Sequence, residues 1–482
     1  MDPEKVAPTA EHIDATQSVE SLSDEHREYL IRRHGTAELS PLPDMNDANP
    51  YNWRLSKKLI NLLLVAFHGL MSTFTAASIQ SAFHNIAVDL GVSIQRASYL
   101  TSLVIAILGG APVFWKPLSD RYGRRPIFLI SLVGSLIGNV ACAKCHSYAT
   151  MGLCRAITAF FICPAGALGS AVVSECFFKH QRARYMGMWT VMISLGVPTA
   201  PLIFGFVATR VGYRWIYWVL AITNGVQFLL YLIFGHETRY VPGRTPTSLF
   251  KFKRIDTTPL TLWDFIKPFT FVYRMRVMIP AFSYSMVFLL AGVFITIEIP
   301  QLFVEQFGFN AEQIGLQNIA IIIGTLIGEQ IGGSASDQWM AQRRKKVHNV
   351  KPEYRLWLSY PGYVLATVGI IVFLVQLNNA GQHWNVTPLV GAGIAAAGMQ
   401  IVTTVLVTYA VDCYPKQSSS VGTFITFVRQ TWGFIGPFWF PPMLRTVGLD
   451  GSCGITTALI IVGSVIPTIA IQWSGRKRVI KE

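Results

Sequence analysis

Residues 116–126 read KPLSDRYGRRP, and this short charged stretch stands between two apolar ones, residues 97–114 and 126–143. One carboxylate, that of Asp120, lies among four bases, and Gly123 follows it closely. About 20 apolar residues in a helix cross the hydrocarbon core of a bilayer. Because the flanking stretches are close to that length, the sequence predicts a tight charged turn that joins two membrane helices at one surface of the membrane.

The same alternation of apolar stretches and short polar connections fills most of the chain. Of its 482 residues, 51% are hydrophobic and 14% are charged, and the mean hydropathy is +0.41. We therefore predict an all-α polytopic membrane protein with 12 transmembrane helices. The predicted spans are residues 59–83, 97–114, 126–143, 150–178, 186–208, 213–235, 277–303, 313–333, 356–376, 386–411, 421–443 and 452–473.

The net charge of +14 is distributed in a way that indicates membrane topology and not nucleic-acid binding. After the first span, Lys and Arg number 26 in the segments on the side of the N-terminus and 5 in the segments on the other side. Positive charge collects on the cytosolic side of membrane proteins. We therefore predict an integral membrane protein with both termini in the cytosol, place it in the plasma membrane, and exclude a nucleic-acid partner.

The longest cytosolic connection divides the predicted spans into six and six. The predicted parts are a disordered cytosolic tail (1–48), a six-helix bundle (49–235), a cytosolic linker (236–276), a second six-helix bundle (277–473) and a short cytosolic tail (474–482). The two bundles echo each other. Asp337 and Arg343 follow span eight as Asp120 and Arg124 follow span two, and Asp412 ends span ten as Glu175 ends span four. Such internal duplication is typical of transporters whose halves rock about a site near the membrane midplane.

The seven cysteines lie along the chain without an even framework, so we expect no structural disulfides. Residues 142–146 match the spacing of a c-type haem attachment, but Cys142 ends a hydrophobic helix and no soluble haem domain surrounds it. We therefore predict no cofactor and no metal site.

The turn at residues 116–126 resembles the loop signature of the major facilitator superfamily, Gly-x-Leu-x-Asp-Arg-x-Gly-Arg-Arg. The resemblance implies two pseudo-symmetric six-helix bundles. It also implies a gating loop, whose residues are Asp120, Arg121, Gly123, Arg124 and Arg125, with Asp337 in the second half. Lys116 replaces the first glycine of the signature. Topology alone would explain the bases of this turn, but not Asp120 and Gly123 at this spacing.

The fifth predicted span contains a second signature. Gly187, Gly196, Pro201 and Gly205 resemble the antiporter motif of the superfamily, Gly-x8-Gly-x3-Gly-Pro-x2-Gly-Gly, in which two glycines are replaced here by Ala200 and Phe204. Small residues let membrane helices touch, and proline bends them. Glycine and proline are common in any packed membrane helix, so chance spacing is the alternative explanation. The resemblance favours export over import.

Three further segments are similar to those of the fungal drug:proton antiporters with twelve spans. They are residues 49–53 before span one, 213–215 at the start of span six and 236–239 at its end. Their aromatic residues would also serve as ordinary anchors at the membrane interface. The resemblance covers residues 49–473.

Ionisable groups within the predicted spans are candidates for proton coupling, because charges are rarely buried in a membrane without a function. Burial favours the neutral form of a carboxyl group and a neighbouring cation favours the ionised form, which is the switch that a proton-coupled carrier needs. The candidates are Glu298, Glu329, Glu175, Asp412 and His68. Alternatively, Glu175 and Asp412 cap helix ends or pair with Lys179 and Lys416, and His68 is a hydrogen-bonded structural residue.

Two deep arginines and several aromatic residues are candidates for lining the substrate cavity. They are Arg155, Arg429, Tyr284, Phe288, Phe427 and Trp432. Arg155 keeps the arginine of a family pattern in span four, Arg-x-x-Gln-Gly, while Thr158 and Ala159 replace its last two residues. An arginine at this depth should face a cavity or a carboxylate, since exposure to lipid is costly. The alternatives are a snorkelling structural arginine, and aromatic residues that face lipid or neighbouring helices.

Together these observations predict a proton-coupled antiporter, monomeric in the bilayer, that exports a small lipophilic compound such as a drug, toxin or secondary metabolite. The chain has no GxxxxGK[ST] loop, so ATP is not expected to drive it. An alternative is a transporter of a charged metabolite, either a polyamine or an organic acid. A membrane-embedded enzyme or a nutrient sensor is more remote, because no cluster of nucleophiles and no long signalling tail is present.

Overall fold

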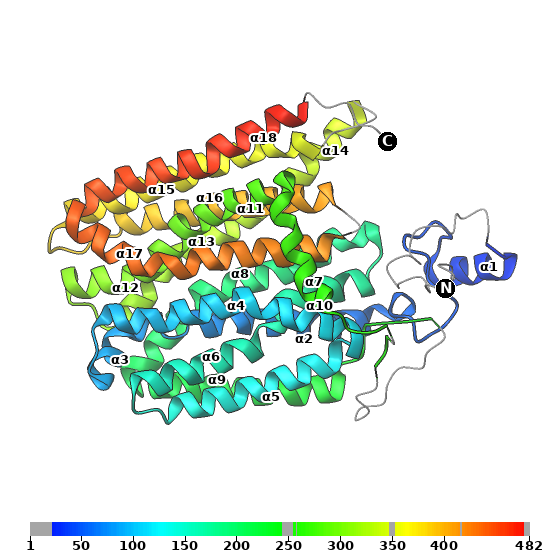
Figure 1. The fold of residues 1–482 in the computed structure, drawn as a ribbon, viewed down its shortest axis with the longest axis horizontal. Helices are drawn as coiled ribbons and strands as arrows, with labels where there is room; N and C mark the ends of the chain where they lie inside the picture. The colour runs from blue at the N-terminus through cyan, green and yellow to red at the C-terminus, as the bar shows by residue number, and fades with distance from the viewer. Residues whose placement is uncertain (1–21, 243–253, 257, 347–351, 415–416, 477–482) are drawn as a thin grey trace.

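The computed structural model describes residues 22–242, 254–256, 258–346, 352–414 and 417–476. Within these ranges the chain forms helices and no strand, and the long helices run side by side along the longest axis of the molecule (Figure 1). Both ends of the described chain lie at the same end of this bundle, which we call the terminal end. The predicted all-α polytopic fold is confirmed.

Eleven helical stretches in the described ranges are long and apolar enough to cross a membrane. They are Leu55–Leu90, Ile94–Tyr122, Arg124–Ala143, Tyr148–Cys176, Lys179–Arg210, Arg214–Phe234, Met275–Phe307, Ala311–Arg343, Pro352–Ala380, Thr387–Cys413 and Ser418–Gly475. The last has 58 residues. A straight helix of that length would be about 87 Å long, far beyond the thickness of a bilayer.

This last stretch contains a break at Gly448, whose φ of 69° and ψ of −177° are not helical. Gly448 lies within α17 (Ser418–Ile460), and Figure 1 shows the orange ribbon turning back before it continues into the red α18 (Ile466–Arg476). The predicted number of 12 spans is therefore not confirmed as it stands. The count of eleven becomes twelve only when this stretch is divided at Gly448.

The helices before and after the linker form two groups, drawn in blue to green and in green to red (Figure 1). The first group contains α2 (Leu55–Ala77), α3 (Phe83–Leu90), α4 (Ile94–Tyr122), α5 (Arg124–Ala143), α6 (Tyr148–Ile162), α7 (Pro164–Cys176), α8 (Lys179–Arg210) and α9 (Arg214–Phe234). The second contains α11 (Met275–Val287), α12 (Phe294–Phe307), α13 (Ala311–Gln330), α14 (Ser336–Lys346), α15 (Ser359–Ala380), α16 (Thr387–Cys413), α17 and α18. Between them lies the short α10 (Leu262–Ile266), which belongs to the linker.

The two groups touch where small residues let backbones approach. A Cβ on Gly205 of α8 would lie 2.5 Å from the carbonyl oxygen of Ala311 in α13, and one on Gly315 would lie 2.6 Å from that of Pro201. A Cβ on Gly109 of α4 would lie 2.7 Å from the Cβ of Gln430 in α17. Small residues allow this close packing between membrane helices.

Two π-helical segments interrupt the second group near predicted site residues. One, Phe288–Val293, joins α11 to α12, and the other, Ile331–Ala335, follows α13 directly after Glu329 and Gln330. Such segments are rare, and they occur frequently at functional sites.

The segment before α2 differs from the disorder predicted for residues 1–48. In its described part, from residue 22, α1 (Asp24–His34) is capped by the side chain of Ser23 and by Gly35, whose φ is 78°. Leu30, Leu39 and Phe178 form a small buried apolar cluster. This pairing of distant apolar residues could not be read from the low hydrophobicity of the segment. Residues 1–21 lie outside the described ranges.

The N-terminal segment is fixed to the turn between α7 and α8. The backbone N–H of Lys179 donates to the carbonyl of Ser40 at 2.8 Å, and the hydroxyl of Tyr51 donates to the carbonyl of Ser174 at 2.5 Å. The hydroxyl of Tyr240 at the start of the linker donates to the carboxylate of Asp44. The segment therefore packs on the first group of helices at the terminal end.

Candidate functional site

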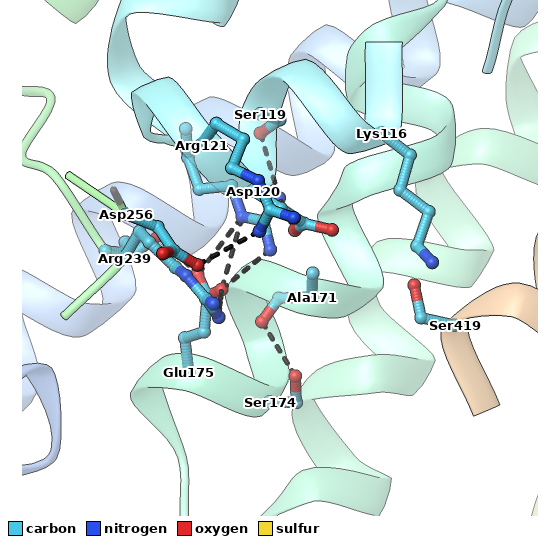
Figure 2. A network of polar contacts seen from close by, with 12 residues as sticks. Lys116, Ser119, Asp120, Arg121, Ala171, Ser174, Glu175, Arg239, Asp256 and Ser419 are labelled. Atoms are coloured by element: carbon cyan, nitrogen blue, oxygen red, sulfur yellow. Dashed lines mark hydrogen bonds and ion pairs between the residues drawn. The ribbon is translucent and has the colours of Figure 1, made fainter. Parts of the chain in front are cut away.

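Arg124, the first residue of α5, is the centre of a charge network at the terminal end. Its guanidinium lies 2.8 Å from a carboxylate oxygen of Asp120 and 2.9 Å from one of Glu175, and it donates to the hydroxyl of Ser119 at 2.9 Å. Figure 2 shows these groups gathered between the end of α4 and the end of α7, with Arg239 beside Glu175. The network joins three helices, and Glu175 pairs with Arg124, whereas the sequence suggested Lys179.

Glu237, just after α9, holds the turn in place. Its carboxylate accepts the backbone N–H groups of Arg124 at 2.8 Å, Arg125 at 3.0 Å and Arg239 at 2.8 Å. Burial raises the pKa of this carboxyl, while the three N–H donors act in the opposite direction. Gly123, at a φ of 99°, has no room for a Cβ, because Glu237 and Ile255 lie against it. Both features explain why the motif needs a glycine there.

Arg121 points to the linker and not to this network. Its guanidinium lies 3.0 Å from a carboxylate oxygen of Asp256 and 3.4 Å from one of Asp264, and its carbonyl accepts the N–H of Ile255 at 2.8 Å. Burial alone would raise the pKa of Asp256. The hydrogen bonds from the N–H and hydroxyl of Thr258 and the nearby charge of Arg121 outweigh burial, so the pKa lies below its usual value. The linker is therefore bound to the gating loop through ionised groups.

Lys116 provides a contact between the two groups of helices. Figure 2 shows its side chain pointing away from Asp120 and toward α17, where its amine donates to the hydroxyl of Ser420 at 3.1 Å. The residue that replaces the first glycine of the signature thus connects α4 to α17. The fifth member of the loop, Arg125, donates to the carbonyl of Leu232 at 2.9 Å.

The second half repeats this network with other spacings. Arg355, just before α15, lies 3.4 Å from a carboxylate oxygen of Asp412 and donates to the hydroxyl of Ser336 at 2.7 Å. These three residues therefore match Arg124, Glu175 and Ser119. Arg343, which follows span eight as Arg124 follows span two, lies with its guanidinium 4.9 Å from the ring centre of Tyr354.

The spacings differ because the connection in the second half is longer. Ser119 and Arg124 are 5 residues apart, whereas Ser336 and Arg355 are 19 apart, because α14 is inserted between them. The side chain of Asp337 and the whole of Lys416 lie outside what the structure describes.

Glu329 lies at the contact between the two groups of helices, with a side chain that is 9% exposed. The amide nitrogen of Gln400 in α16 donates to its carboxylate, and the same nitrogen donates to the hydroxyl of Ser194 in α8 at 3.1 Å. A single amide therefore connects a buried carboxylate of the second group to the first group. Gln400 and Ser194 were not predicted, because neither carries a charge.

Glu298 is more deeply buried, at 1% exposed, and its carboxylate accepts the amide of Gln301 at 3.3 Å. Within the Met275–Phe307 stretch, it lies in the half farther from the terminal end. No hydrogen bond among the described residues links Glu298 to Glu329, so they are two separate buried carboxylates.

Arg429 and two predicted aromatic residues lie together in the second group. The guanidinium of Arg429 donates to the hydroxyl of Tyr284 at 3.0 Å and lies 4.8 Å from the ring centre of Phe288. Phe427 contacts Phe269 of the linker instead. Trp432 contacts Phe282, with ring centres 5.4 Å apart. We refer to Arg429, Tyr284 and Phe288 as the arginine–aromatic cluster.

Arg155 and His68 are enclosed within the first group. Arg155 is 2% exposed and donates to the carbonyls of Leu100, Thr75 and Ala76, so it faces neither a described carboxylate nor an open cavity. His68 is fully buried, and one ring nitrogen bonds to the hydroxyl of Ser131 at 3.1 Å. Neither residue contacts Glu298, Glu329 or the arginine–aromatic cluster.

The antiporter motif divides into three different environments. Gly196 packs against α2, where a Cβ would lie 2.7 Å from the carbonyl of Leu70, while Pro201 and Gly205 meet α13. Gly187 has no atom within 4 Å of a Cβ position. Only part of the motif therefore serves the contact between the groups.

This difference predicts opposite effects for two identical changes. Gly205→Ala should lower the stability of the purified protein by about 1–3 kcal/mol, because the methyl group meets backbone atoms of α13. Gly187→Ala should leave stability unchanged or raise it by up to about 1 kcal/mol, since it replaces glycine within a helix without a clash. Thermal unfolding in detergent would compare the two variants. Equal melting temperatures would contradict the assigned contact.

A bundle of membrane-spanning helices with ion networks at one end and buried carboxylates along its interior defines a polytopic membrane transporter. The sequence profile described as Major Facilitator Superfamily matches residues 65–437. The chain belongs to the major facilitator superfamily, which is a family of transporters and not of enzymes.

Its named relatives include fungal transporters. The chain is 25% identical over 463 residues to the efflux pump radE of Floropilus chiversii, which covers 90% of this chain and 84% of that protein. It is 25% identical over 416 residues to the probable efflux pump mfs2 of Aspergillus flavus, and the match covers 80% of this chain and 95% of that protein. Among solved structures, the human organic anion transporter MFSD10 matches with a TM-score of 0.58 and 17% identity, covering 86% of this chain and 99% of that one. The structural match supports the fold.

Proposed function

We propose that this protein is a proton-coupled antiporter that exports a small lipophilic compound, such as a drug, toxin or secondary metabolite, by alternating access. The names of two relatives, both efflux pumps, support the direction of transport. The charge bias supports an orientation with the terminal end in the cytosol, and we place the protein in the plasma membrane as a monomer.

The observation that carries this proposal is the Gln400 amide that connects Glu329 to Ser194. An ionised carboxylate only accepts hydrogen bonds, whereas a protonated one also donates. When Glu329 gains a proton, its new O–H becomes a donor, and the proposed response is that the Gln400 amide turns its oxygen toward it. Its nitrogen then leaves Ser194, and the contact between the halves is broken. Protonation is thereby coupled to separation of the two groups of helices.

The other charged groups fit a transport cycle of this kind. Glu298, nearer the non-cytosolic surface, would pass protons inward to Glu329. The network around Arg124 and its repeat around Arg355 would break and re-form as the cytosolic end opens and closes, since charge-assisted hydrogen bonds are strong but geometrically specific. Protons enter from outside while substrate leaves.

The arginine–aromatic cluster is the proposed contact for substrate. Tyr284 and Phe288 offer faces on which a flat lipophilic molecule can stack. Half-buried Arg429 adds donors that would orient a carbonyl or hydroxyl group of such a molecule. A mainly apolar site with few polar groups is typical of small-molecule binding.

Purified protein in proteoliposomes with a pH gradient would test the function. Proton flux is recorded while lipophilic metabolites, polyamines and dicarboxylates are added one class at a time. A flux evoked by the lipophilic class would support the proposal. A flux evoked only by a charged class would replace it with the second candidate, and no flux with any class would reject proton coupling for all three.

The second candidate is transport of a charged metabolite, and one observation favours an organic acid. In the described part of the chain, Arg429 forms no ion pair, and its partners are the hydroxyl of Tyr284 and two aromatic rings. An arginine without a carboxylate partner is suited to an anionic ligand.

Arg429→Gln separates the two candidates. If the substrate is lipophilic, efflux should fall by less than about tenfold, because the stacking faces of Tyr284 and Phe288 remain. If the substrate is an organic acid, efflux should fall on the order of 100-fold, because a buried anion would lose its partner. The concentration dependence of transport in the same proteoliposomes would show which result holds.

A further inference from the structure

The linker segment from α10 through residue 275 exposes an unusual amount of apolar surface. Many of its large apolar side chains are exposed. Their exposed fractions are 81% for Leu262, 59% for Trp263, 50% for Ile266, 85% for Tyr273 and 65% for Met275. An aqueous surface rarely carries so many large apolar groups close together.

The opposite side of this segment is held by the protein and reaches both groups of helices. Asp264 pairs with Arg121 at the end of α4. Pro268 and Phe271 are buried, and the ring of Phe271 lies 5.6 Å from that of Tyr414, which follows α16. Figure 1 shows the segment around α10 crossing the long helices at the terminal end instead of running along them. It therefore lies across the molecule as a strap.

The exposed side of this strap continues the lipid-facing surface of the spans. Phe265 stacks on Phe114 of α4, with ring centres 6.1 Å apart, and Phe114 is itself 43% exposed on a membrane-spanning helix. Tryptophan and tyrosine, here Trp263 and Tyr273, are the residues enriched at membrane interfaces.

Charge supports the same environment. The strap and the residue after it contain three bases, Lys267, Arg274 and Arg276, and one acid, Asp264. Asp264 pairs with Arg121, and the guanidinium of Arg276 lies 3.6 Å from a carboxylate oxygen of Glu353. Arg274 is exposed. Basic residues beside an apolar face attract the anionic headgroups of the cytosolic leaflet, each contributing about 1 kcal/mol near the surface.

We infer that residues 262–275 form an interfacial anchor that binds the cytosolic leaflet through its apolar side chains and anionic lipid headgroups through its bases. The anchor thereby holds Asp264 in place against Arg121 of the gating loop. The proposed occupant of this surface is lipid. The experiment below distinguishes lipid from a protein partner. The inference requires only that the chain spans a membrane, so it does not depend on the substrate or on proton coupling.

Depth-dependent fluorescence quenching tests this anchor without a transport assay. The partly exposed Cys154, Cys413 and Cys453 are first replaced by serine, and a bimane dye is attached to Tyr273→Cys in full-length protein in nanodiscs. The matched control is Glu28→Cys on α1, an exposed site at the same end of the protein. Nitroxide-labelled headgroups should quench the dye at position 273 several-fold more strongly than the dye at position 28. Equal quenching at the two sites would overturn the anchor.

The lipid composition then tests the role of charge. Replacing about 30% of the phosphatidylcholine by phosphatidylserine should increase quenching at position 273, and Arg274→Gln should reduce that increase. Quenching that is strong but independent of phosphatidylserine would overturn the headgroup assignment. The variant Leu262→Ser with Ile266→Ser removes only exposed side chains and should weaken quenching while the melting temperature in detergent stays unchanged. A soluble protein that protected position 273 from the nitroxide lipids would replace lipid as the occupant.

Discussion

A Glu329→Gln variant should reach the membrane at the wild-type level and lose proton-driven efflux on the order of 100-fold, as expected when a required proton-transfer group is removed. Glutamine fills nearly the same volume and still accepts the hydrogen bond from Gln400, so the packing between α13 and α16 should persist. It cannot gain or release a proton. The variant therefore holds the contact with Gln400 in one state at every pH, and the cycle stops.

Two further variants make this result specific. Glu305→Gln applies the same chemical change at an exposed position of α12 and should leave efflux unchanged. Glu298→Gln should also abolish proton-dependent efflux if Glu298 passes protons to Glu329, and unchanged efflux would remove it from the mechanism. Proton flux and substrate efflux are measured together in proteoliposomes. Full efflux by Glu329→Gln would exclude the proposed coupling through Gln400.

Arg124→Ala should give the largest loss of stability of any single change at the terminal end. The carboxylates of Asp120 and Glu175, whose side chains are 30% and 15% exposed, would remain without the guanidinium that separates and neutralises them. Removing one partner of a buried ion pair lowers stability by about 3–5 kcal/mol. We therefore expect a melting temperature in detergent far below that of the wild type, and little protein in the membrane.

The repeated network supplies a control for this variant. Arg355→Ala removes the equivalent arginine of the second half, but the carboxylate of Asp412 is 39% exposed, so water can replace the lost partner. Its expected loss is about 1 kcal/mol, in the range of exposed pairs. Arg124→Lys should recover part of the loss, since it keeps the charge without the bidentate geometry. Similar melting temperatures for Arg124→Ala and Arg355→Ala would contradict the importance assigned to burial.

The spans were predictable because each depends on a local run of apolar residues, and the charged turn at residues 116–126 was predictable because its residues are contiguous. The pairs within the network were harder to predict. Glu175 was paired in sequence with nearby Lys179, while its partner is Arg124, 51 residues away. A neighbour along the chain is a poorer ion-pair partner than a distant residue that the fold places at the correct angle. The sequence carries no signal for that angle.

Other misses have equally physical causes. Gln400 and Ser194 are uncharged residues of ordinary membrane helices, so only the contact between α16 and α8 reveals their role. Arg155 was expected at a cavity because a deep arginine needs partners, but three backbone carbonyls supply them. The sequence correctly indicated that the buried charge of Arg155 needs hydrogen-bond partners, but it did not show which groups provide them.

The contact of Gly205 with α13 has a mechanical consequence. It lies about 39 Å along α8 from Lys179 and about 7.5 Å from Arg210, at 1.5 Å per residue. If α8 turned about this point by about 10°, its end at the terminal end of the bundle would move about 7 Å while its other end moved little more than 1 Å. The contact is thus a fulcrum with unequal arms. A small angular change would therefore open the terminal end of α8 widely, whereas an equal opening at the other end would require the contact itself to shift.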